Sequence, residues 1–302
     1  MYQAIARNVR LSWLLLGLFV LLILVMGYVF GQIVKQGYVG IAVALVVAAG
    51  GALASYYYSD RIVLAISGAR EVSPDEYPFL HNTVEGLAIA AGLPKPRLYV
   101  IPDSAPNAFA TGRDPSHAVV AVTTGLLDKL NRLELEGVLA HEMSHIQHYD
   151  VRLSTLVVVL VGLVALVSDW FVQLARHIDL GDIDGDSDSP IAALWLVLAF
   201  LLALLAPLIA QLIHFAISRQ REYLADAGGV MLTRYPEGLA TALEKLDADR
   251  EPLEVANKAT AHLYIVNPLK EWGGTLNGLF NTHPPIEERV RRLRGLVTGG
   301  VA

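Results

Sequence analysis

The sequence of 302 residues contains no cysteine. This absence excludes disulfide bonds and any metal site built on thiolate ligands, and it is consistent with a reducing compartment. An excess of positive charge is also missing, because 23 lysines and arginines stand against 29 aspartates and glutamates, for a formal net charge of −6. Such a balance argues against nucleic acid as a binding partner.

Charged residues are absent from two long apolar stretches near the N-terminus. Residues 11–30 and 40–58 each match the roughly 20 residues that a helix needs to cross the hydrocarbon layer. Apolar segments at 153–175 and 190–218 bring the predicted transmembrane helices to four, and a mean hydropathy of +0.47 supports a protein of the lipid bilayer. A cleaved signal sequence is disfavoured because the first apolar run is longer than a signal core, and no cleavage site follows before Gln32.

The arginines that flank the predicted spans all fall on one side of the membrane. They are Arg7, Arg10, Arg61, Arg70, Arg152, Arg219 and Arg221. The opposite side has Lys35 and a loop at 179–189 with five aspartates and no basic residue. Because positive residues concentrate in cytoplasmic loops, we expect a multi-pass protein of the cytoplasmic (inner) membrane with both termini in the cytoplasm. Calcium binding by the acidic loop is disfavoured, because its glycine comes too early for an EF-hand and no glutamate closes it.

These spans divide the chain into four parts. Two N-terminal transmembrane helices occupy 1–58, a first cytoplasmic part 59–152, a transmembrane hairpin 153–218 and a second cytoplasmic part 219–302. The fold class is therefore mainly α with a small β-sheet. Apolar spacing predicts helices over 75–92, 126–149, 219–232, 237–247 and 284–296, and β-forming residues predict strands over 97–101, 107–111 and 117–125.

The predicted helix over 126–149 contains the segment HEMSH. His141 and His145 are four residues apart, so their side chains lie on one face of a helix at a spacing that allows both imidazoles to reach one ion. Glu142 between them can reach a water on that ion, which makes it the expected general base. A chance pattern with both histidines hydrogen-bonded in a core is the alternative. His148 is an alternative ligand, although three histidines from one helix would crowd a tetrahedral ion.

A hydrolytic zinc site needs a third protein ligand and one open position for water. Without cysteine, the candidates are the other histidines and the carboxylates. Glu222, in REYLAD directly after the fourth predicted span, is the foremost candidate, because an antiparallel hairpin of spans would return the chain beside HEMSH. Asp226 is one helical turn further on and is placed to hold the second nitrogen of a ligand imidazole.

Four motifs in order resemble the HtpX-type membrane zinc metalloproteases, relatives of the prenyl-protein (CAAX) endopeptidases. These motifs are PNAFATG, HEMSH followed by Asp150, REYLAD and THPPIEER. The resemblance covers nearly the whole chain and implies a cytoplasmic zincin-like protease domain. It implies one zinc ion per chain, held by His141, His145 and Glu222, with Glu142 as the base.

The resemblance also implies roles for residues around that ion. Asp226 and Asp150 would support the ligands, and Asn107, Ala108 and Phe109 would lie on the edge strand that pairs with the substrate backbone. His283 and Arg289 match positions that close over the cleft and steady the developing oxyanion.

The leading functional hypothesis is a zinc-dependent endopeptidase that cleaves misfolded or flexible membrane proteins as part of protein quality control. A CAAX-type protease is the nearest rival, although those relatives usually have more spans. A non-catalytic scaffold stabilised by zinc is disfavoured because a structural site needs no base such as Glu142. A site-2-type protease and a transporter fit less well, because Glu222 lies outside the spans and those spans offer no charged pathway. No oligomeric state is predicted.

Overall fold

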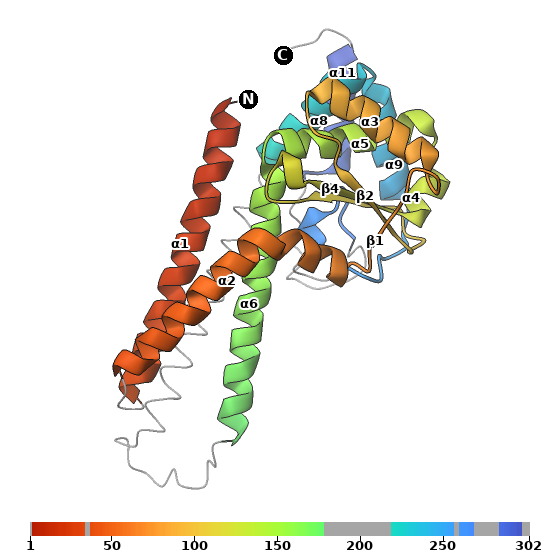
Figure 1. Cartoon of the computed structure of the whole chain (residues 1–302). Helices are drawn as coiled ribbons and strands as arrows, with labels where there is room; N and C mark the ends of the chain where they lie inside the picture. The colour runs from red at the N-terminus through yellow and green to blue at the C-terminus, as the bar shows by residue number, and fades with distance from the viewer. Residues whose placement is uncertain (1, 34–36, 178–218, 257–259, 269–283, 298–302) are drawn as a thin grey trace.

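The computed structural model describes residues 2–33, 37–177, 219–256, 260–268 and 284–297, and helices dominate these segments (Figure 1). The helices are α1 (Tyr2–Ile33), α2 (Gly37–Ile66), α3 (Pro78–Ala91), α4 (Thr124–Lys129), α5 (Arg132–Gln147), α6 (Asp150–His177), α8 (Arg219–Thr233), α9 (Pro236–Ala248) and α11 (Ile286–Val297). Short 3-10 turns occur at η1 (Pro115–His117) and η3 (Ala261–Leu263). The strands are β1 (Arg70–Glu71), β2 (Arg97–Ile101), β3 (Ala108–Thr111) and β4 (Val119–Thr123).

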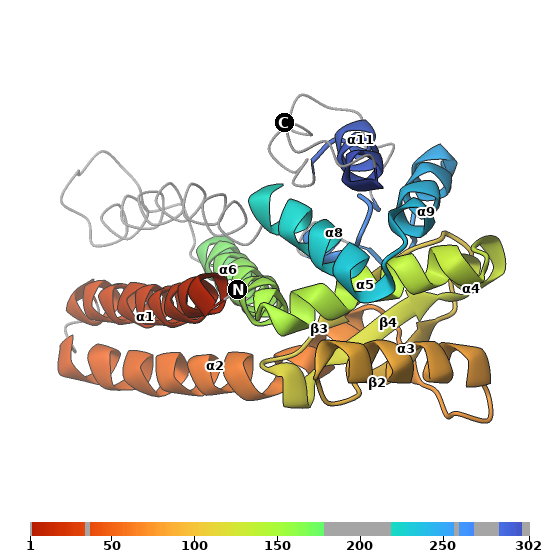
Figure 2. The ribbon, with the colours of Figure 1, turned by 90° about the horizontal axis from the view of Figure 1, so that it is seen from above.

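Two helices in the described part of the chain are long and apolar enough to cross a membrane. They cover Gln3–Val25 in α1 and Ile41–Ile66 in α2, and the two helices lie side by side away from the sheet (Figures 1 and 2). The described residues therefore contain two independent membrane-crossing helices and not the four that the sequence predicted for the whole chain. The third expected span falls on α6, which passes the same test only as Asp150–Leu163 together with α5, across a bend of 82°. The fourth, at 190–218, lies outside the described residues, as does the acidic loop at 179–189.

The first turns of α6 pack against the two N-terminal helices. Leu153, Val157 and Leu160 form one buried cluster with residues of α1 and α2 such as Leu15 and Ala48. This packing explains why the start of the apolar segment, from Leu153 to Leu163, is apolar although it contacts protein. It also ties the N-terminal helices to the chain that leaves the HEMSH helix.

The four strands form a small mixed sheet in the order β1-β2-β4-β3, with β3 at one edge. β2 and β4 are parallel, with Arg97 opposite Val119, whereas β3 is antiparallel to β4, with Ala108 opposite Val122. The expected strand over 117–125 is shorter, because His117 belongs to η1 and Thr123 caps α4. The Thr123 hydroxyl accepts a hydrogen bond from the Leu126 amide at 3.1 Å, which starts the helix.

Each face of the sheet packs against different elements. Val100, Val120 and Val122 belong to the main core with α3, α5 and α9. Ile101, Phe109 and Ala121 join a second cluster with the end of α2, with α6 and with Leu253, Leu263 and Tyr264. The alternation along β2 and β4 sends side chains to opposite faces. The sheet is therefore held between the HEMSH helix and the helices that lead to the membrane.

The predicted helix over 126–149 is divided into α4 and α5. Asn131 begins α5 with a capping box, since its side chain accepts from the amides of Leu133 and Glu134 while the Glu134 carboxylate accepts from the Asn131 amide. At the other end, Tyr149 has a φ of 61°, which turns the chain sharply into α6. The turn after α5 therefore separates the HEMSH helix from the apolar helix that follows.

Candidate metal centre

The site is built where α8 crosses α5. His141 and His145 lie on one face of α5, and Glu222 lies in the first turn of α8. Gly229 allows the close approach, because a Cβ there would lie 3.0 Å from the His141 amide nitrogen. Gly228 has a Cβ position only 2.1 Å from the Ser144 hydroxyl oxygen, so a larger residue would force the Ser144 side chain or α8 to move. These two glycines, next to REYLAD in the sequence, let α8 bring Glu222 to the histidines.

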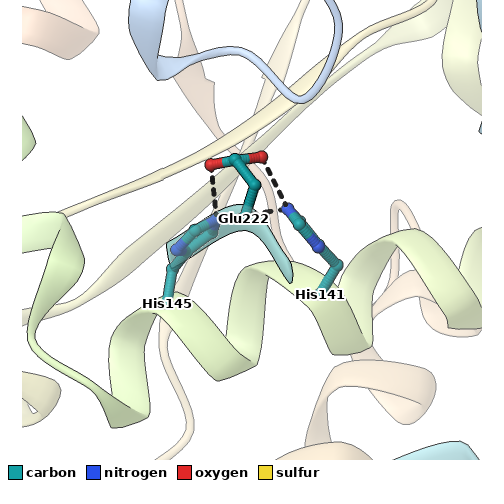
Figure 3. A group of neighbouring side chains, drawn as sticks. All are labelled: His141, His145 and Glu222. Atoms are coloured by element: carbon teal, nitrogen blue, oxygen red, sulfur yellow. Dashed lines mark hydrogen bonds and ion pairs between the residues drawn. The ribbon is translucent and has the colours of Figure 1, made fainter. Parts of the chain in front are cut away.

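Figure 3 shows the two imidazoles and the Glu222 carboxylate meeting above α5. The Nε2 atoms of His141 and His145 are 3.1 Å apart, and Glu222 oxygens lie 3.8 Å from His141 Nε2 and 3.5 Å from His145 Nε2. Ligand atoms bound to one tetrahedral zinc ion at about 2.0–2.2 Å lie about 3.3–3.6 Å from one another. The observed spacing therefore fits a single small ion, and the donor set of two imidazoles and one carboxylate suits zinc.

Two carboxylates orient the imidazoles from behind. Asp226 lies 2.9 Å from His141 Nδ1, and Asp150 lies 3.0 Å from His145 Nδ1. When Nδ1 of each ring donates its proton to a carboxylate, Nε2 keeps a lone pair that faces the other ligand atoms. His148, the alternative ligand, instead uses Nδ1 on the Ser144 carbonyl oxygen at 2.7 Å and caps the end of α5.

Burial and neighbouring charges shift the pKa values of this cluster. Burial lowers the pKa of His141 to about 4, with the charges of Arg289 and His145 acting in the same direction. Burial opposes the charged form of His145, but Asp150, Glu222 and Glu142 outweigh it and raise its pKa to about 9. The two ligand histidines therefore differ in environment although they share one helix face.

Glu142 is buried beside the ligand residues. Burial raises its pKa to about 7, and the charge of Glu222 adds to this shift, whereas His145, Arg289 and a hydrogen bond with the Ala110 backbone oppose it. A carboxyl group with a pKa near neutrality can both accept and release a proton, which is what a general base and acid must do.

Arg289 lies behind the cluster and is fully buried. Its guanidinium donates to both Asp226 oxygens at 2.9 and 2.7 Å and to the Ile265 carbonyl oxygen at 3.1 Å, and it lies 3.6 Å from Glu222. Burial works against the charge of Asp226, but Arg289 and His141 lower its pKa to about 2. In this position Arg289 contacts Asp226. Its expected role in steadying an oxyanion stays a prediction. His283, its expected partner, lies outside the described residues.

A pocket of about 30 Å³ opens at the cluster and has room for at least one water molecule. Its lining includes His141, Glu142, His145 and Glu222, and also residues that the sequence did not predict to belong to the site. These are Ala110, Val151, Ser154, Arg221, His262, Leu263, Tyr264 and Ile265. The segment 260–268 has no motif and no helical or strand periodicity, so no signal in it would have placed it beside HEMSH.

The expected substrate edge, Asn107 to Phe109, is partly covered by the same segment. The Ala108 carbonyl oxygen accepts from the Ile265 amide at 3.0 Å, and the Asn107 side chain donates to the Val266 carbonyl oxygen at 3.0 Å. The Phe109 ring is fully buried and packs edge-on against Tyr264. A peptide that paired with Ala108 would therefore have to displace Ile265.

The chain matches known proteins along most of its length. The pattern of peptidase family M48 matches residues 74–297. A protein named Protease HtpX homolog from Dictyoglomus thermophilum is 49% identical over 97% of this chain and 94% of its own length. Proteins with the same name are 46% identical in Tropheryma whipplei strain Twist, over 97% and 98% of the two chains, and 42% in Streptococcus gordonii, over 97% and 99%. A crystal structure of S. mikatae Ste24p is 22% identical with a TM-score of 0.49, over 94% of this chain and 64% of that one.

Proposed function

The chain belongs to peptidase family M48 and is a membrane metallopeptidase, and we propose that His141, His145 and Glu222 hold its metal as one zinc ion per chain. The observation that carries this proposal is the set of three ligand atoms, from two helices distant in sequence, that lie within 4.8 Å of one another. When bound, zinc at such a site polarises the scissile carbonyl and lowers the pKa of a bound water toward about 7.

Glu142 is the proposed general base. Its carboxylate takes the proton from the attacking water and delivers it to the leaving amide nitrogen. Burial, with the neighbouring charge of Glu222 acting in the same direction, raises the pKa of Glu142 to about 7, so the carboxyl group can perform both transfers at neutral pH. Asp226 and Asp150 hold the two imidazoles in the tautomer that directs Nε2 to the ion. Arg289 holds Asp226 in turn.

The substrate is a polypeptide, and we propose that it comes from flexible or misfolded membrane proteins. The site lies near the junction of the domain with the N-terminal helices, since Asp150 and Val151 of α6 line the pocket. An extended segment would add to the β3 edge through backbone hydrogen bonds, with Ile265 displaced from Ala108. This mode of binding favours unfolded segments over compact ones. It also supports a role in protein quality control.

We further propose that the pocket faces the cytoplasm from the inner membrane. Arg7 and Arg10 belong to the first turns of α1 and Arg61 to the last turns of α2. These two helix ends lie toward the domain in Figure 1, as expected for the cytoplasmic side. A CAAX-type activity on prenylated tails would use the same chemistry. Cleavage of a prenylated peptide, but not of an unfolded protein, would favour that activity over the proposed one.

The proposed function is tested with sealed bacterial membrane vesicles that contain the full-length protein. An unfolded test protein added outside should be cut by inside-out vesicles and not by right-side-out vesicles. A zinc chelator should abolish cleavage, and added zinc should restore it. Cleavage that resists the chelator would contradict the metal proposal. Cleavage only by right-side-out vesicles would reverse the orientation.

A further inference from the structure

The first membrane helix contains a fully buried side-chain amide, which membrane anchoring alone does not require. Asn8 lies in α1 within the candidate span Gln3–Val25. Its Nδ2 donates to the His148 carbonyl oxygen at 2.9 Å and to Asp150 Oδ1 at 2.6 Å. A buried amide is costly unless it is hydrogen-bonded, and here its bonds lead out of α1 into the turn between α5 and α6. In Figure 2 the start of α1 lies beside the start of α6.

The Asp150 contact continues to a proposed metal ligand. Asp150 uses Oδ1 for Asn8 and Oδ2 for His145 Nδ1, at 2.6 and 3.0 Å. The same carboxylate therefore joins the membrane helix to the ligand imidazole. The bond from Asn8 to the His148 carbonyl oxygen also fixes the end of α5, one turn after His145.

The Asn8 side-chain oxygen contacts α8, the helix that carries Glu222. Arg221 Nη1 donates to Asn8 Oδ1 at 3.4 Å, and Arg221 is buried next to Glu222 in α8. Arg221 Nε also lies 3.9 Å from Asp150 Oδ1. Without the bond from Asn8, the Asp150 carboxylate would shift toward Arg221. The hydrogen bond between Asp150 and His145 would then weaken. One side chain of α1 thus contacts both elements that bear the proposed ligands.

We propose that Asn8 is a positioning residue for the metal centre and that it acts through Asp150 on His145. The first membrane helix then sets the metal affinity of the site as well as anchoring the chain. This inference rests on the proposed metal site and extends it to a helix that precedes the family match at residues 74–297.

The test compares Asn8→Ala and Asn8→Ser with Ser12→Ala in the full-length, detergent-purified protein. Ser12 is a matched control because it is also fully buried, lies one turn along α1, and donates to the Asn8 carbonyl oxygen within the same helix at 2.8 Å. Zinc affinity is measured by competition with a chromophoric chelator. Loss of the direct partner in Asp150→Ala should weaken zinc binding about 10- to 100-fold. Asn8→Ala, which removes a bond one step further from the ligand, should weaken it by about 10-fold, the lower end of that range. Ser12→Ala should leave it unchanged.

A double-mutant cycle with Asp150→Ala separates positioning from a general effect on packing. If Asn8 acts through Asp150, Asn8→Ala should have little further effect on zinc affinity in the Asp150→Ala background. An equal loss in both backgrounds, or no loss in the wild-type background, would overturn the inference. Asn8→Ser keeps a shorter donor and should fall between wild type and Asn8→Ala, so it provides the measurement if Asn8→Ala does not fold. A wild-type protein that binds no zinc would instead refute the proposed metal site.

Discussion

Glu142→Gln should slow the cleavage of an unfolded protein by at least about 100-fold while zinc stays bound. The amide keeps the size of the side chain but cannot take a proton from the attacking water. Loss of a general base typically costs about 10²- to 10⁴-fold in rate. Because Glu142 is not among the proposed ligands His141, His145 and Glu222, the zinc content should remain that of the wild type. Cleavage rate and zinc content are measured on the same purified sample.

Glu136→Gln is the matched control for this prediction. Glu136 lies on α5 as well and is only half-buried, outside the residues that line the pocket. Its substitution should leave the cleavage rate unchanged. An active Glu142→Gln protein would contradict the assigned base and would leave the zinc-stabilised scaffold as the better account of HEMSH.

Arg289→Leu should destabilise the protein strongly. The substitution would leave Asp226 buried without its bidentate partner and would remove the guanidinium that lies 3.6 Å from Glu222. Removal of one partner from a buried ion pair costs about 3–5 kcal/mol, because the remaining charge stays out of water. Arg289→Lys should lose less stability, since it keeps the charge but not the planar pair of donors. The unfolding midpoint in detergent is measured by circular dichroism.

Arg291→Leu provides the comparison on the same helix. Arg291 pairs with Glu288 at the surface, with 77% of its side chain exposed, so its loss should shift the midpoint little. Equal midpoints for Arg289→Leu and wild type would show that Asp226 does not need the guanidinium. A normal midpoint with lost cleavage would favour the oxyanion role that the resemblance implies for Arg289.

Local pattern was sufficient to predict much of the fold. The apolar runs at 11–30 and 40–58 lie within α1 and α2, and the predicted helix over 75–92 corresponds to α3, which begins with Pro78 and ends before Gly92 in the left-handed conformation. The break between α4 and α5 was also readable, because Asn131 and Glu134 have the spacing of a capping box. The prediction of one helix over 126–149 overlooked that signal.

Some positions in the candidate site follow from the local sequence, and others depend on tertiary packing. Helical periodicity alone places His141 and His145 on one face, and Glu222 could be inferred only from the expected return of the chain after a hairpin. Contacts of Asn8 and the covering of Ala108 by Ile265 depend on packing between distant segments. No periodicity or spacing encodes them. Asn8 reads in the sequence as a polar residue before an apolar run.

The central claim is that two imidazoles and the Glu222 carboxylate bind one zinc ion. Zinc X-ray absorption on the purified full-length protein tests it most directly. We expect two imidazole nitrogens and oxygen ligands at about 2.0–2.2 Å with no sulfur, and the loss of this signal at equal zinc supply in Glu222→Gln. A third imidazole in the wild-type spectrum, or an unchanged spectrum in Glu222→Gln, would contradict the claim.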